Sequence, residues 1–186
     1  MNFEYVAVFF TVVCIFLAGR NNIHTWWTGI VACIAYGYVF YGAKLYADAL
    51  LQVFFIGTSI LGWVLWSKRT DQTERPITST DQGVIALITA LAVLVTIGYS
   101  ELLKAYTDAA APLFDSAVLI CSIIGQILLM RRNIQTWPVW ILVNIISVPL
   151  YYSRELYLSA ALYAVFLVHA IYAWHKWYGI YKKQTV

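Results

Sequence analysis

The sequence predicts an all-α integral membrane protein with seven transmembrane helices, arranged as two parallel three-helix repeats joined by a central helix. The chain has 186 residues and is 62% hydrophobic but only 11% charged, whereas a soluble domain is about a quarter charged. Seven apolar stretches are long enough for a helix to cross a bilayer, which takes about 20 residues. In addition, residues 3–66 match residues 114–177 without gaps.

The predicted helices are separated by short polar breaks, except for one longer linker at residues 67–80. They cover residues 3–19, 23–42, 46–66, 82–103, 113–130, 134–152 and 157–177. Polar residues inside these stretches recur at three- and four-residue spacing, which excludes the two-residue alternation of barrel strands. The first stretch lacks the basic start of a signal peptide, so we expect a retained first helix.

The internal repeat has a fixed offset of 111 residues, which aligns motifs as well as composition. Arg20, Asn22, Ile23, Thr25 and Trp26 recur as Arg131, Asn133, Ile134, Thr136 and Trp137. The predicted parts are a first repeat (1–66), a linker with the central helix (67–112), a second repeat (113–178) and a tail (179–186). Because one helix separates the repeats, both cross the membrane in the same direction. Parallel repeats of this kind place a ligand near mid-membrane, between them.

The basic residues predict the orientation of the chain. Of the 12 Lys and Arg residues, only Lys44, Lys104 and Arg154 fall on the side of the N-terminus. The positive-inside rule therefore places the N-terminus outside and the C-terminus in the cytoplasm. All eight tryptophans fall toward the cytoplasmic halves of their helices. We expect them to form half of an aromatic belt at the membrane interface.

The sixth predicted helix carries the most informative polar stripe. One face of this helix holds Trp137, Trp140, Asn144, Ser147 and Tyr151. A buried amide without a partner costs about 1–3 kcal/mol, so Asn144 bonds either another helix or a ligand. The second predicted helix is less polar there, with Gly29 and Cys33 in the places of Trp140 and Asn144. We expect a substrate ring to bind near Trp140 and Asn144, with Gln52 completing the polar contacts.

Polar residues on other predicted helices add candidates, each with a plainer alternative. Asp115 lies near an outer helix end and could simply be solvated. His169 could be a proton relay, a ligand contact or a hydrogen-bonded core residue. The full set of candidate substrate-binding residues is Trp140, Asn144, Gln52, Trp137, Tyr36, Tyr151, Tyr163, Phe55, Ser59, Gln126, Asp115 and His169.

Several functional classes lack their signatures. The sequence has no Walker loop, HExxH or Gly-rich dinucleotide turn, so we expect neither an enzyme nor a cofactor. Cys14, Cys33 and Cys121 lie in apolar stretches without metal-site spacing, so we expect free thiols and no metal. A retinal-type sensor would need a lysine inside the last helix, whereas Lys176 lies at its end. We find no basic stripe for nucleic acid. No carboxylate falls at mid-membrane, which favours passive transport.

Three motifs together resemble the PnuC family of vitamin transporters over nearly the whole chain. They are the run WPVWILVN (137–144), the run LYADALLQVFF (45–55) and the tryptophan pair that closes each repeat. The resemblance implies a fold similar to the SWEET sugar transporters, with three helices on each side of a central one. It also implies import of nicotinamide riboside by facilitated diffusion in a bacterial inner membrane. A homotrimer and a cytoplasmic kinase that traps the substrate are further implications.

The resemblance leaves the vitamin open, because related branches of the family carry thiamine, riboflavin or deoxynucleosides. Phe114 and Cys33 differ from the enterobacterial nicotinamide riboside pattern, which has Trp and Asn there. Thiamine, carried by the PnuT branch, is the alternative. Both nicotinamide riboside and thiamine carry a fixed positive charge on a flat ring. Tryptophan and tyrosine bind such rings by stacking and cation–π attraction.

Overall fold

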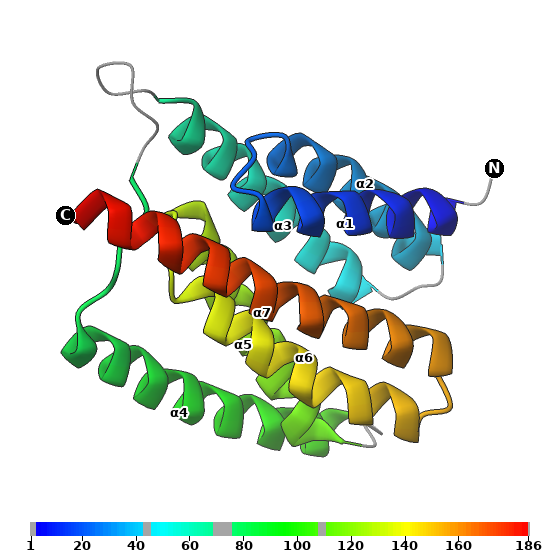
Figure 1. Ribbon diagram of the computed structural model, residues 1–186. Helices are drawn as coiled ribbons and strands as arrows, with labels where there is room; N and C mark the ends of the chain where they lie inside the picture. Colours follow the sequence, from blue (N-terminus) through cyan, green and yellow to red (C-terminus); the bar gives the residue numbers. More distant parts are fainter. Residues whose placement is uncertain (1–2, 43–45, 69–75, 108–110, 186) are drawn as a thin grey trace.

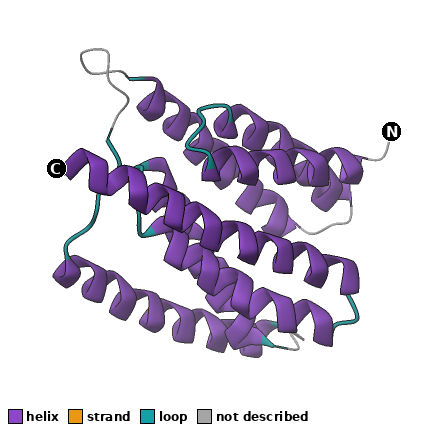
Figure 2. Cartoon of the chain, viewed as in Figure 1, coloured by secondary structure: helices purple, strands orange, loops and turns teal. Residues whose placement is uncertain are grey.

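The computed structural model describes residues 3–42, 46–68, 76–107 and 111–185, most of which lie in seven α-helices (Figures 1 and 2). The helices are α1 (Phe3–Gly19), α2 (Thr25–Gly42), α3 (Tyr46–Ser67), α4 (Gln82–Tyr106), α5 (Pro112–Met130), α6 (Thr136–Ser153) and α7 (Tyr157–Thr185). The seven predicted helices are confirmed, but α7 continues well past its predicted end at residue 177. Lys182 and Lys183 lie in its last turn, where positive charges interact favourably with the negative end of the helix dipole.

Consecutive helices run in opposite directions along the bundle (Figure 1). The chain therefore begins at one end of the molecule and finishes at the other, which we call the C-terminal end. Within the described residues, four segments are long and apolar enough to cross a membrane, judged by length and composition. They are Ala49–Ser67, Gln82–Tyr106, Pro112–Met130 and Tyr157–Gln184. The expectation of an all-helical membrane protein is confirmed, and helices suit lipid because they satisfy their own backbone hydrogen bonds.

The helices pack as two three-helix units with α4 at the side. The first unit is α1–α3 and the second is α5–α7, and within each unit consecutive helices are in contact. The units meet where α1 packs against α7 and where α3 packs against α5. Among the described helices α4 packs only against α5, and apolar side chains such as Leu94, 66% exposed, cover its free face. Such a face is suited to lipid.

The two units repeat the same local hydrogen bonds at the predicted offset. The Thr25 hydroxyl donates to the Cys14 carbonyl at 2.9 Å, and the Thr136 hydroxyl donates to the Gly125 carbonyl at 2.8 Å. Each bond joins the start of one helix to the second half of the helix before it. The turns agree as well, because Asn21 and Arg132 both have a φ angle of 56°. These contacts agree with the repeat in the sequence.

The end of the long linker is bound to the second unit at the C-terminal end. Thr78 forms an isolated bridge with Asn133, in which its amide donates to the Arg132 carbonyl at 3.0 Å. Ile77 is only 3% exposed, and its amide donates to the Gln184 side chain at 3.0 Å. The linker thereby ties the turn between α5 and α6 to the end of α7.

Four tryptophans lie inside the bundle rather than at its lipid-facing surface. Trp26, Trp66, Trp137 and Trp177 are each no more than 5% exposed. Trp26 packs edge-on against Trp66 at 5.1 Å, and Trp137 packs edge-on against Trp177 at 5.4 Å. The expected aromatic belt is therefore wrong for these four residues, which we call the tryptophan cluster. Edge-to-face packing stabilises aromatic pairs beyond the area they bury. By contrast, the exposed tryptophans are Trp27, Trp63 and Trp174.

Candidate functional site

A cavity of about 290 Å³ lies between the two units and brings ten of the twelve candidate residues together. These ten are Tyr36, Gln52, Phe55, Ser59, Gln126, Trp137, Trp140, Asn144, Tyr163 and His169. They come from five different helices, so the fold and not sequence proximity assembles them. The volume is at the low end of the roughly 300–1,000 Å³ found for small-molecule pockets. Apart from His169, no described residue that lines the cavity carries an acidic or basic side chain.

Trp140 and Asn144 lie one turn apart on α6 and face the same cavity. Asn144 is 4% exposed, and its amide nitrogen donates to the Trp140 carbonyl at 2.7 Å. Its amide oxygen forms no hydrogen bond with another described residue, which leaves an acceptor for a ligand. The Trp140 ring packs on α5 at Gly125, where an added Cβ would lie 3.1 Å from Trp140 Cε2. A side chain at 125 would require the ring to move by a few tenths of an ångström, so Gly125 allows the indole to pack this close to α5.

Gln52, Phe55 and Ser59 form a stripe on α3, because spacings of three and four residues place side chains on one helix face. Gln52 forms no hydrogen bond with another described residue, so its amide is also free to bind a ligand. Tyr163 of α7 faces the cavity and packs against Phe166, which lines it too, with ring centres 5.9 Å apart. The cavity thus combines polar amide groups with aromatic walls.

Two cavity residues also hold the units together. His169 of α7 has its Nε2 atom 3.0 Å from the Ile15 carbonyl of α1. Because a carbonyl only accepts, this nitrogen carries the proton. Gln126 of α5 donates to the Thr58 hydroxyl of α3 at 3.4 Å. His169 is therefore a hydrogen-bonded interior residue that also lines the cavity.

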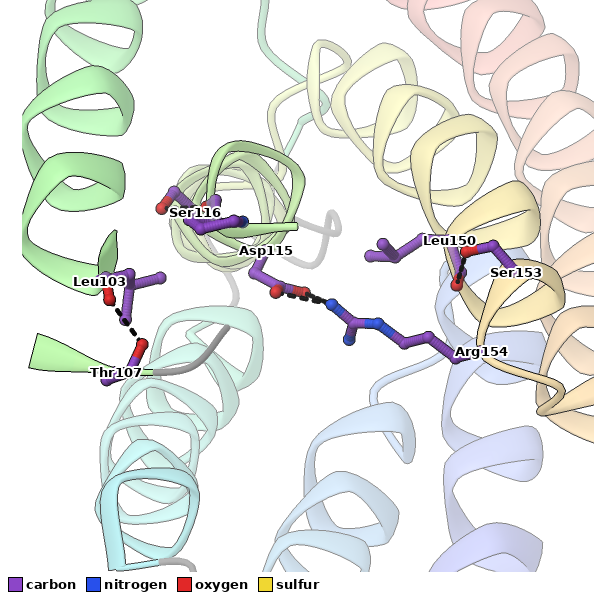
Figure 3. A network of polar contacts seen from close by, with 8 residues as sticks. Leu103, Thr107, Asp115, Ser116, Leu150, Ser153 and Arg154 are labelled. Carbon is purple, nitrogen blue, oxygen red and sulfur yellow. Dashed lines mark hydrogen bonds and ion pairs between the residues drawn. The ribbon is translucent and has the colours of Figure 1, made fainter. Parts of the chain in front are cut away.

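Asp115 and Tyr151 do not line the cavity. Asp115 lies at the start of α5 and accepts two hydrogen bonds from Arg154, at 2.7 and 2.9 Å (Figure 3). It is thus neither a cavity residue nor simply solvated, because it joins α5 to the end of α6. Tyr151 packs behind the wall, with its ring centre 5.0 Å from that of Tyr163. Phe114, where the sequence departs from the enterobacterial pattern, is 55% exposed and also lies away from the cavity.

The first helix contributes cavity residues that no polar pattern in the sequence indicated. Thr11, Cys14, Ile15 and Ala18 of α1 all line the cavity. Their side chains are mostly apolar and gave no polar signal. The repeat offset carries the missing signal, because the candidate Gln126 is equivalent to Ile15. The repeat thus predicts Ile15 of α1 from Gln126, and Phe166 of α7 from Phe55, as residues that line the cavity.

The arrangement suits a flat aromatic solute with polar substituents. Tryptophan and tyrosine rings offer faces for stacking, and the amides of Gln52 and Asn144 offer donors and acceptors. The described residues contain no group of three side chains that could hold a metal ion. A multi-pass helical bundle with a ligand-sized cavity between two packed units is the architecture of a small-solute membrane transporter.

The family model for nicotinamide mononucleotide transporters matches residues 1–179, and the chain belongs to this family. The resemblance to PnuC proteins is thereby confirmed, and the protein is a membrane transporter rather than an enzyme. The nicotinamide riboside transporter PnuC of Escherichia coli (strain K12) is 28% identical over 180 residues, which is 83% of this chain and 75% of that protein. The riboflavin/roseoflavin transporter RibM of Streptomyces davaonensis is 27% identical over 145 residues, or 74% of this chain and 66% of RibM.

A solved structure shows the same fold. The crystal structure of the vitamin B3 transporter PnuC superposes with a TM-score of 0.75 at 24% sequence identity. The match covers 97% of this chain and 82% of that one. All seven helices therefore belong to one shared architecture.

Proposed function

We propose that the protein carries nicotinamide riboside across a bacterial inner membrane by facilitated diffusion. The observation that carries the proposal is the convergence of Trp140, Asn144 and Gln52 on one cavity, in a chain similar to proteins named nicotinamide riboside transporters. The pyridinium ring stacks on Trp140, a cation–π contact of about 0.5–2 kcal/mol. The amides of Asn144 and Gln52 hydrogen-bond to the hydroxyl groups of the ribose.

Passive transport is supported by the chemistry of the cavity wall. No described cavity residue is acidic, so no carboxylate is there to bind a coupling cation or relay a proton. A site without a counter-charge binds a cation modestly and releases it readily. Accumulation in the cell then depends on a cytoplasmic kinase that traps the imported nicotinamide riboside as its phosphate.

The transport cycle we propose is a movement of the two units about an axis along the membrane normal. Two contacts between units support this axis, because they join equivalent pairs: His169 with Ile15, and Thr58 with Gln126. A third joins a position to its own equivalent, since Arg132 Nε donates to Asn21 Oδ1 at 3.0 Å across the offset of 111 residues. Such pairing is expected for parallel repeats in a three-plus-one-plus-three arrangement, as in SWEET transporters.

The remaining features of the proposal concern orientation and assembly. The excess of basic residues at the C-terminal end supports a cytoplasmic C-terminus and an external N-terminus. We also propose the parts 1–66, 67–112, 113–178 and 179–186, and a homotrimer. The apolar free face of α4 supports contacts with lipid or a second copy.

Thiamine and riboflavin are the alternative substrates. Thiamine presents a cationic ring like that of nicotinamide riboside, and riboflavin is favoured by the similarity to RibM. Uptake of the three labelled vitamins into liposomes that contain the purified protein separates these functions. We expect uptake of nicotinamide riboside, which stops when the internal and external concentrations are equal. Uptake of thiamine or riboflavin alone would show that this vitamin, and not nicotinamide riboside, is the substrate. Accumulation driven by an ion gradient would overturn the passive mechanism.

A further inference from the structure

The two units differ most in size where they line the cavity with Trp140 of α6 and Gly29 of α2, which are equivalent positions. In the second unit the Trp140 ring covers Gly125, which does not line the cavity. In the first unit a Cβ added at Gly29 would meet two described side-chain atoms within 4 Å, Cys14 Sγ at 3.2 Å and Ser59 Oγ at 3.7 Å. All three of these residues line the cavity. Where the second unit places an indole, the first unit therefore has no side chain, and we call the part of the cavity wall formed by Gly29, Cys14 and Ser59 the Gly29 recess.

Ser59 brings an unpaired polar group to this recess. The residue is 3% exposed, and its hydroxyl forms no hydrogen bond with another described residue. The adjacent Thr58 differs, because its hydroxyl donates to carbonyls of its own helix at 3.0 and 3.1 Å. The position equivalent to Ser59 in the second unit is Ala170, which has no polar side chain. The Ser59 hydroxyl borders the cavity, so a ligand group that hydrogen-bonds to it there gains affinity.

The opposite wall of the recess is fixed by hydrogen bonds. Cys14 Sγ donates to the Thr25 carbonyl at 3.2 Å and lies 3.4 Å from the Thr25 hydroxyl. The sulfur is thus committed to the first unit and serves as a wall of constant shape. The recess consequently offers one polar group, Ser59 Oγ, and a width set by Gly29.

We propose that the Gly29 recess receives the substituted edge of the substrate's aromatic ring, with Ser59 bonded to that substituent. The face of the ring stacks on Trp140, on the other side of the cavity. For nicotinamide riboside, the group that enters the recess is the carboxamide. Gly29 is then a specificity-determining residue, because a larger side chain would fill the space that the substituent needs. This inference rests on the proposed function.

The test compares two ligands that differ only at the ring edge: nicotinamide riboside and pyridine riboside, which lacks the carboxamide. Calorimetry measures the binding of each to the full-length parent, to Ser59→Ala and to Gly29→Ala. We expect each substitution to weaken nicotinamide riboside binding about tenfold and to change pyridine riboside binding by less than about twofold. Equal losses of affinity for the two ligands, or no loss for either, would contradict the proposed role of the Gly29 recess.

Two further variants separate ligand contact from packing. Cys14→Ala combined with Gly29→Ala removes the one side-chain atom that crowds the new methyl group below 3.4 Å. We expect the double variant to stay impaired for nicotinamide riboside, and recovery would show that the loss came from packing. Gly98→Ala, where an added Cβ meets nothing within 4 Å, is the matched control and should bind like the parent. A parent protein that binds neither riboside would overturn the proposed function, and the recess with it.

Discussion

The two three-helix units are built alike but are held at their ends to different degrees. In the second unit, Arg154 binds Asp115 at one end, and the linker residue Thr78 pairs with Asn133 at the other. In the first unit Glu4 stands at the position of Asp115, but the position of Arg154 is occupied in the sequence by Ala43. Among the described residues, the second unit therefore has ties at its ends that are not found in the first unit. In a carrier whose units move against each other, we expect the second unit to be the framework and the first unit the moving part.

The two units also contribute different side chains to the cavity. The second unit supplies the large ring of Trp140 and the amide of Asn144, whereas the first has Gly29 and Cys33 at the equivalent places. A binding site between repeats is thus made asymmetric by different side chains at equivalent positions. The predictions below change one unit at a time and compare it with its counterpart.

The largest effect is expected for Gly125→Ala in the second unit. The added methyl group would lie 3.1 Å from Trp140 Cε2 and 3.4 Å from Val139 Cγ1, so the indole must move. Overpacking of this kind costs about 1–3 kcal/mol of folding free energy, and the displaced ring loses its place at the substrate. Thermal unfolding in detergent and calorimetric binding of nicotinamide riboside measure the two losses. Unchanged stability and affinity would mean that Gly125 does not seat Trp140.

Asn144→Ala should weaken binding by about 1–3 kcal/mol, because a polar group of the substrate loses its partner. Cys33→Ala, at the equivalent position of the first unit, should change affinity by less than about 0.5 kcal/mol, since this substitution removes no strong hydrogen-bonding group. Equilibrium binding to the two purified variants makes the comparison. A greater loss at Cys33 than at Asn144 would reverse the roles of the two units.

Trp140→Ala should weaken binding by about 1–2 kcal/mol through loss of the cation–π contact. The control is Trp174→Ala, in the same unit but 40% exposed and outside the cavity. Trp66 is unsuitable as a control because it is buried in the tryptophan cluster. Calorimetry should show weaker binding for Trp140→Ala than for Trp174→Ala. Equal affinities for Trp140→Ala and the parent would show that the substrate ring does not stack on Trp140.

The smallest effect is expected for Asp115→Asn. The ion pair with Arg154 is partly exposed, with side chains 28% and 33% accessible, so solvent screening limits its contribution to about 1 kcal/mol or less. We expect a slightly lower unfolding temperature, a difference that shrinks at high salt, and unchanged substrate affinity. Glu4→Gln in the first unit should leave the unfolding temperature unchanged. A clear loss of affinity in Asp115→Asn would place Asp115 on the substrate path after all.

The helices and most of the cavity could be predicted because polar residues are scarce in this chain. An amide such as Gln52 or Asn144 inside an apolar span needs a partner, and in the fold both amides face the cavity. Two features could not be predicted in the same way. Tryptophan is found both at membrane interfaces and in packed interiors, so composition did not separate Trp66 from the exposed Trp63. The partner of Asp115 comes from a turn 39 residues away, which no local pattern specifies.

The linker segment also constrains the order in which the protein can be completed. Ile77 is bonded to Gln184, 107 residues later in the chain. Because synthesis proceeds from the N-terminus, this segment stays without its partners while four more helices are made. The hydrogen bonds of Thr78 form once the turn around Asn133 exists, and that of Ile77 forms only when α7 is finished. The end of the last helix thus acts as the closing step of assembly, fastening a segment that was synthesised long before it.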